Sequence, residues 1–328
     1  MTGRRQAEVG IVLYPGVQTS AALAMTDLFT VSNRFQAPGA ADETASIVVS
    51  HWRVEHPGRA PERVFETEAV EGDHPDVLII PPSLDSPVTA EIAAPYVAWL
   101  NAVHAGGGAL GSVCAGAFLL GETGLLDGRP ATTHWMLEDQ FRARFPRALV
   151  DVDRLLIDGG SVLTAGGLMS WTDLCLRLVE RLRGAEVMTQ AARFMLVDPP
   201  GREQRYYSLF SPRLGHGDAA VADVQHWLQD TEARDISLET LAARAGLERR
   251  TFLRRFRKAT GMTSSEYGQR LRVGKACERL QFSDRPIDQI AWEVGYGDPG
   301  AFRKVFARFV GLTPGEYRQR FGVAPHRS

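Results

Sequence analysis

The chain has 328 residues, enough for two domains with separate cores, and its 44% hydrophobic content is typical of a globular protein. The longest weakly polar run, residues 109–121, is too short and too rich in glycine to span a bilayer, and MTGRRQAEVG lacks the apolar region of a secretory signal.

The net charge of −2 hides an asymmetry, because residues 220–328 hold 19 Lys and Arg against 13 Asp and Glu, a net charge of +6, which leaves −8 for the rest. The positive charge of this C-terminal part can neutralise the phosphates of DNA.

Short apolar runs alternate with amphipathic segments through the first 200 residues. Buried strands are predicted over residues 9–14, 46–54, 77–80 and 109–113, helices over 21–31 and 89–104, and a loop containing a hairpin over 55–74. Beyond residue 114 we expect a short strand at 131–133, a helix over 135–144, a hairpin in LLIDGGSVLTAGG, and helices over 170–183 and 185–194. Strands that alternate with helices indicate a doubly wound parallel sheet.

Residues 199–219 are rich in proline, glycine and polar groups and show no periodicity. Such composition is typical of a linker. We therefore predict one domain over residues 1–198 and a second over residues 220–328.

The second domain contains an internal repeat. LETLAARAG at 238–246 returns as IDQIAWEVG at 287–295, and the pair Phe252 and Phe256 returns as Phe302 and Phe306. Glycine after an amphipathic helix permits the left-handed residue that ends it, and two phenylalanines four residues apart share one helical face. Ser237 and Pro286 can start the opening helices. Each copy therefore reads as a helix-turn-helix in an all-α domain.

The second helix of the first copy carries a basic outer face. Arg250 and Arg254 are one turn apart and project together, which suits contacts to guanine in a major groove. The second copy offers Arg303, Lys304 and Arg308. The alternative interpretation is a solvated charged surface without a partner.

Residues 220–328 resemble the DNA-binding domain of the AraC/XylS transcriptional regulators. The segments that carry the resemblance are LAARAGL, TFLRRF, RLRVGKACERL, IAWEVGYGDPGAFRKVF and GLTPGEYR. The resemblance implies that the partner is double-stranded promoter DNA. The DNA-contacting residues predicted on this basis are Arg249, Arg250, Thr251, Leu253, Arg254, Arg257, Lys258, Asp298, Arg303 and Lys304. Leu253 departs from the family pattern, since it stands where family members often carry a polar base-reading residue. Residues 299–301 (PGA) give the second recognition helix few polar groups, so we expect the first copy to dominate sequence reading.

Cys114 follows a predicted strand and precedes a predicted helix, as the cysteine of a nucleophile elbow does. A helix N-terminus there would favour a thiolate and attract a small ligand bearing a carboxylate or a carbonyl. His134 lies at a second change from strand to helix, and Asp27 lies on the first predicted helix; these two residues are the candidate polar partners of Cys114. The alternative is a structural cysteine and a structural histidine. The three cysteines, Cys114, Cys175 and Cys277, and the scattered histidines have no metal-ligand spacing, so we expect a reducing cytoplasm, no metal and no cofactor.

Residues 7–197 resemble the class I glutamine-amidotransferase-like superfamily, which includes intracellular proteases and isonitrile hydratases. The resemblance is carried by CAGAFLLGETGLLDGRPATTHW, YPGV and TAGGLMSWTDL. This implies a flavodoxin-like α/β fold. In the protease-like members histidine follows the elbow cysteine, where this chain has Ala115, and hydratase-like members carry an acid where it has Ala21.

The superfamily includes a branch fused to AraC-type domains, and this sequence has both parts in that order. We therefore predict a transcriptional regulator that is not an enzyme, assembles as a homodimer, senses a small-molecule effector through its first domain and has no contact with a membrane. Two alternatives stay open: a cysteine-dependent amidase or hydratase fused to a DNA-binding domain, and a constitutive DNA-binding protein whose first domain only dimerises.

Overall fold

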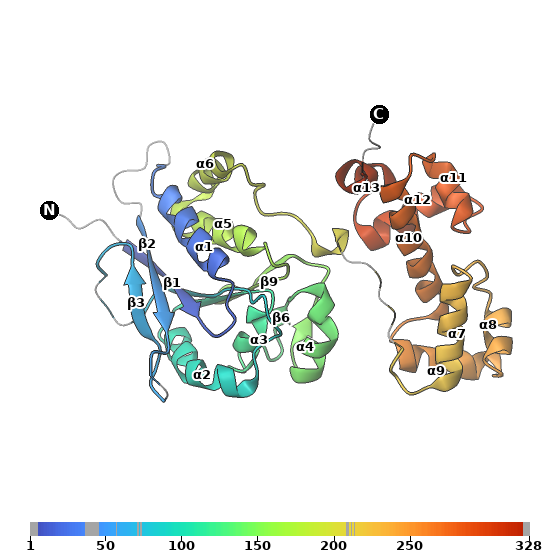
Figure 1. The fold of residues 1–328 in the computed structure, drawn as a ribbon, viewed down its shortest axis with the longest axis horizontal. Coiled ribbons are helices and arrows are strands. Elements are labelled where there is room, and N and C mark those ends of the chain that lie inside the picture. Colours follow the sequence, from blue (N-terminus) through green and yellow to red (C-terminus); the bar gives the residue numbers. More distant parts are fainter. Residues whose placement is uncertain are drawn as a thin grey trace. The chain divides into compact units, whose positions relative to one another are not determined.

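The computed structural model describes residues 6–36, 46–56, 58–70, 72, 74–207, 210, 212 and 214–323. Parts of the predicted linker (208, 209, 211 and 213) lie outside these ranges, as do residues 1–5 of the segment predicted to lack a secretory signal. The chain divides into two compact units, Met1–Gln204 and Arg205–Ser328, which we describe separately (Figure 1). In the described ranges, no helix combines the length and apolarity that a membrane span needs.

A seven-stranded sheet forms the centre of the first unit within the described residues. Its strands, in spatial order, are β3 (Glu62–Glu66), β2 (Ser46–Arg53), β1 (Gln6–Leu13), β4 (Val77–Ile80), β5 (Ala109–Val113), β9 (Val162–Ala165) and β8 (Leu156–Asp158). The five inner strands are parallel, whereas β3 and β8 pair antiparallel with β2 and β9. The doubly wound sheet is therefore confirmed, and the hairpin predicted in LLIDGGSVLTAGG forms the β8–β9 edge. The hairpin expected within residues 55–74 was wrong: the described residues of this region supply one strand, β3, which pairs with β2. A separate parallel pair joins β6 (Pro130–Ala131) to β7 (Leu149–Val150).

Helices cover both faces of this sheet (Figure 1). One core packs α1 (Thr19–Ser32), α5 (Trp171–Arg183) and α6 (Ala185–Met195) against it. The other core packs α2 (Ala90–Ala105), α3 (Gly116–Gly121) and α4 (Glu138–Arg144), the last preceded by the 3-10 helix η1 (Trp135–Leu137). The central strand β4 is buried at every position, as expected of a parallel strand covered on both sides.

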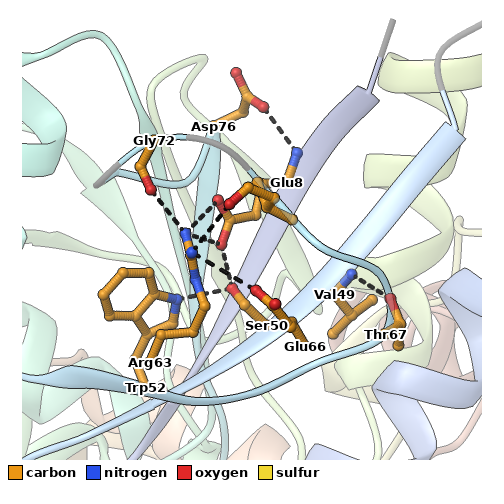
Figure 2. A network of polar contacts seen from close by, with 10 residues as sticks. Glu8, Val49, Ser50, Trp52, Arg63, Glu66, Thr67, Gly72 and Asp76 are labelled. Atoms are coloured by element: carbon orange, nitrogen blue, oxygen red, sulfur yellow. Dashed lines mark hydrogen bonds and ion pairs between the residues drawn. The ribbon is translucent and has the colours of Figure 1, made fainter. Parts of the chain in front are cut away.

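A polar network joins β1, β2 and β3 (Figure 2). The Glu8 carboxylate, on a residue only 4% exposed, accepts from the hydroxyl of Ser50 and from Nη2 of Arg63 at 3.1 Å to each oxygen. Trp52 donates its indole N–H to Ser50 at 2.7 Å, and the Arg63 guanidinium lies 4.9 Å from the Trp52 ring. Because a buried carboxylate is costly without partners, this network is what allows an acidic residue inside β1.

The second unit is helical in the described residues and contains two similar modules. The first contains α7 (Ala219–Asp230), α8 (Leu238–Arg244) and α9 (Arg249–Thr260), and the second contains α11 (Ile287–Glu293), α12 (Pro299–Val310) and α13 (Pro314–Phe321). The long helix α10 (Ser264–Phe282) contributes to both hydrophobic cores, with Tyr267 in the first and Leu280 in the second. The 3-10 helix η2 (Gln204–Tyr206) spans the division between the units.

The repeat also includes the helix that precedes each helix-turn-helix, which the sequence motifs did not reveal. Gln225 on α7 donates to the hydroxyl of Tyr267 at 3.2 Å, and Gln281 on α10 donates to the hydroxyl of Tyr317 at 2.7 Å. The second half of α10 therefore plays the part in the second module that α7 plays in the first.

The expected helix boundaries are confirmed in both modules. The Ser237 hydroxyl accepts from the backbone N–H of Thr240 at 3.3 Å, and Pro286 is the N-cap of α11. Gly246 and Gly295 have φ angles of 62° and 88°, which a residue with a Cβ adopts only under strain. The turn in each module is thus built on glycine.

Candidate nucleic-acid interface and ligand site

Helix α9 is fixed to the first module by its inner face. Phe252 and Phe256 are fully buried, with ring centroids 5.4 Å apart. Glu248 caps the N-terminus by accepting from the backbone N–H of Arg250 at 3.2 Å, and Gly261 ends the helix with a φ of 79°. This anchoring determines which side chains α9 presents to solvent.

The outer face of α9 carries a stripe of unpaired cations, which we call the α9 stripe: Arg250, Arg254, Arg257 and Lys258. All four residues are exposed. Within the described ranges their side chains make no hydrogen bond or ion pair. Arg250, Arg254 and Arg257 follow the i, i+4, i+7 spacing of one helical face. An uncompensated positive stripe on a rigid helix is suited to a polyanion.

The other predicted residues of α9 differ from this stripe. Arg249 pairs with Glu239 of α8 at 3.0 Å, with both side chains about 60% exposed. Thr251 is half-buried, and Leu253 is 41% exposed between the charged residues. Arg255, part of the same charge run, holds Asp218, the N-cap of α7, through two hydrogen bonds of 2.9 and 2.7 Å. The Arg255 hydrogen bond holds the pKa of Asp218 below its usual range, so Arg255 is a structural residue.

Helix α12 offers fewer free cations. Asp298 accepts from the backbone N–H groups of Gly300 and Ala301 at 2.9 and 3.0 Å, which makes it the N-cap of α12, and these bonds lower its pKa. Arg303 forms an ion pair with Asp288 of α11. Lys304 is exposed, and its side chain has no hydrogen-bond or ion-pair partner among the described residues.

Arg308 turns away from the position we expected. It donates to Gln269 of α10 at 2.7 Å, and its guanidinium lies 4.3 Å from the ring centroid of Phe309. Lys304 is therefore the cation of α12 whose side chain makes no hydrogen bond or ion pair among the described residues.

Cys114 occupies the strained turn between β5 and α3. Its φ is 54°, in the left-handed region that residues with a Cβ rarely adopt. Its backbone N–H donates to the carbonyl of Ala165 at 2.8 Å, and its own carbonyl accepts from the hydroxyl of Thr133 at 2.8 Å. The end of β9 and the segment after β6 thus hold the elbow in place.

The thiolate that we expected at this elbow is disfavoured. Cys114 is 5% exposed, and burial raises the pKa of its thiol from 9.0 to about 11. Helix α3 has six residues, and its N-terminus does not offset the loss of solvation. The cysteine is therefore a neutral thiol at physiological pH.

The link between His134 and Cys114 runs through the backbone of Thr133, and Asp27 has no comparable link among the described residues. Thr133, which bonds to Cys114, is followed by His134, whose Nδ1 accepts from the backbone N–H of Met136 at 3.2 Å. Burial lowers the pKa of His134, so it is neutral at pH 7. Asp27 is exposed on the solvent side of α1, and no hydrogen bond or ion pair of the described residues joins it to Cys114 or His134.

Gln204 is a residue of this site that sequence reasoning assigned to the linker. Its side chain is 2% exposed and makes three hydrogen bonds, donating to the carbonyls of Thr133 and Val152 at 2.9 and 2.8 Å and accepting from the N–H of Trp135 at 3.0 Å. A Cβ on Gly166 would lie 2.4 Å from Gln204 Nε2, so glycine makes room for it. The predicted linker therefore begins with residues that belong to the first unit.

Two family models match the chain. Residues 54–181 match the DJ-1/PfpI family, and residues 241–320 match a helix-turn-helix domain. The matched ranges hold the Cys114 elbow and both recognition helices.

The curated relatives are named as HTH-type transcriptional regulators or activators. The HTH-type transcriptional regulator CdhR of Pseudomonas aeruginosa is 29% identical over 230 residues, which are 70% of this chain and 65% of that protein. The regulator GlxA of Rhizobium meliloti is 28% identical over 216 residues, 65% of this chain and 66% of that protein. The activator RhaS of Enterobacter sp. is 36% identical over 106 residues, 32% of this chain and 38% of that protein. The chain thus covers less than two thirds of the length of each of these relatives.

Proposed function

We propose that this chain, which joins a DJ-1/PfpI-family domain to an AraC-type helix-turn-helix domain, is a sequence-specific DNA-binding transcriptional regulator. The observation that carries the proposal is the α9 stripe, a set of exposed cations that have no hydrogen-bond or ion-pair partner in the described part of the chain, on the second helix of a helix-turn-helix. Such a helix lies in the major groove in proteins of this type.

Within this proposal the cations of the stripe have different tasks. Arg250 and Arg254 share one face of the first turns of α9, where a guanidinium can donate two hydrogen bonds to guanine. Arg257 and Lys258, in the last turn, are placed to neutralise phosphates. Lys304 supplies the second module with a phosphate contact.

For the first unit we propose binding of a small-molecule effector rather than turnover. A nucleophilic cysteine needs its thiolate and a neighbouring base. Burial keeps Cys114 protonated, Ala115 follows it, and Ala21, at 1% exposure, stands where an orienting acid is expected. A neutral thiol and a neutral imidazole near a strained turn suit recognition of a small polar ligand better than covalent chemistry.

The test of DNA binding compares two arginines of the stripe on specific and random duplexes. Arg254→Ala should cost about 1 to 3 kcal/mol on the selected site and little on random DNA, whereas Arg257→Ala should weaken both alike and reduce the salt dependence by about one ion. Arg255→Ala is the matched control, because Arg255 is turned to Asp218. Equal effects of Arg254→Ala on both duplexes would contradict base reading, and no binding by the wild-type chain would contradict the proposed function.

A further inference from the structure

The guanidinium of Arg272 contacts both helix-turn-helix modules from α10. Nε and Nη2 donate to the carbonyls of Ala233 and Arg234, in the turn between α7 and α8, at 2.8 Å each. Nη1 donates to the carbonyl of Gly295, in the turn of the second module, at 2.9 Å. Arg272 is 8% exposed, so these bonds lie out of water.

The two turns are shaped to receive this side chain. Ala233 adopts a φ of 54°, which is unusual for a residue with a Cβ. Gly295 has a φ of 88°, and a Cβ there would lie 3.1 Å from Cζ of Arg272. Glycine at 295 is therefore required both by its conformation and by the approach of Arg272.

Arg279 repeats the connection two helical turns later on the same face of α10. It pairs with Glu232 of the first module at 2.9 Å and with Glu293 of the second at 3.4 Å. Each arginine therefore binds both modules, Arg272 through three backbone carbonyls and Arg279 through two carboxylates.

The first module has no counterpart of either arginine. When Gln225 is matched to Gln281, the residues equivalent to Arg272 and Arg279 are His216 and Asp223. The two arginines are thus a property of α10, the helix that has a module on each side.

We propose that Arg272 and Arg279 form a clasp that fixes the separation and rotational phase of the two recognition helices. The protein then accepts one spacing between the two parts of its operator, because a rigid pair of modules cannot follow grooves displaced along or around the duplex. This inference rests on the proposed DNA-binding function. It identifies Arg272 and Arg279 as the residues that restrict which spacing between the two parts of the operator the protein can bind.

The experiment uses the full chain and a duplex selected from random DNA with the wild-type protein. Binding is measured on this duplex and on versions with one or two base pairs inserted or deleted between the two contacted parts. For the wild type we expect at least about a tenfold loss of affinity at two base pairs. For Arg272→Met we expect about tenfold weaker binding to the selected duplex but nearly unchanged binding to the altered ones, which gives a flat profile.

Two further variants keep the test decisive. Arg279→Gln removes only the outer half of the clasp and should flatten the profile partly even if Arg272→Met fails to fold. Lys275→Met is the matched control, because the ion pair that Lys275 makes among the described residues is with Glu278 of its own helix, at 3.0 Å, and it should keep the wild-type profile. A wild-type spacing profile in folded Arg272→Met or in Arg279→Gln overturns the clasp, as does a flat profile in the wild type. Failure of the wild type to select any duplex would instead refute DNA binding.

Discussion

Burial decides the chemistry of Cys114. A helix start and a strained turn predicted an activated thiolate, but loss of solvation raises the pKa of the thiol to about 11. The conflict shows why a local motif did not predict reactivity: the sequence around Cys114 marks the turn, whereas its burial depends on Ala165, Trp171 and other residues far along the chain.

We expect Cys114 in the native protein to react about 100-fold more slowly with iodoacetamide at pH 7.5 than the same residue in denatured protein, because two units of pKa lower the thiolate fraction by that factor. The rate should rise with pH until about pH 11. By the same shift, Cys114 should make folding less favourable between about pH 9 and 11, where the unfolded chain releases a proton that the folded one keeps. Peptide mass spectrometry over a pH series measures the labelling, and rapid labelling at neutral pH would restore the elbow as a candidate nucleophile.

Helix boundaries and turns could be predicted from the sequence because their signals are local. The spacing of apolar residues located β5 to the residue, and glycines marked both helix-turn-helix turns. The bonds from Arg255 to Asp218 and from Gln204 to Thr133 could not be predicted, since they join residues 37 and 71 positions apart. Periodicity carries no information on such pairs.

Asp298 has a structural role that the sequence did not predict. We predicted a DNA contact, and the structure adds a capping role for α12. Asp298→Ala should lower the stability of the protein by about 1 kcal/mol, while Asp298→Asn, which retains an acceptor, should leave it nearly unchanged. Thermal melts of both variants test this. If Asp298→Asn kept its stability but lost binding to the selected duplex, Asp298 would be a DNA-reading residue as well as a cap.

The second unit includes residues that precede α7, the first helix of its repeat. Tyr207 packs on Phe321 with ring centroids 5.4 Å apart, and Phe210 packs on Tyr267 at 5.1 Å. A fragment of residues 205–328 should therefore melt at a higher temperature than one of residues 220–328, because aromatic pairs add to the stability gained by burial. Equal melting temperatures would mean that these rings contribute nothing to the fold of the unit.

The three hydrogen bonds of Gln204 place an upper limit on how strongly an effector can act through this residue. An effector of the proposed kind that displaced the backbones of Thr133, Trp135 and Val152 would break the bonds that Gln204 makes one residue before the second unit begins. Three bonds at about 1 kcal/mol each give at most about 3 kcal/mol, or about a 150-fold change in promoter affinity. We expect the regulatory gain of the wild type to stay below that ceiling and Gln204→Ala to lose most of it. Titrations of promoter DNA with and without effector measure the gain, and a larger value would require a second route of communication.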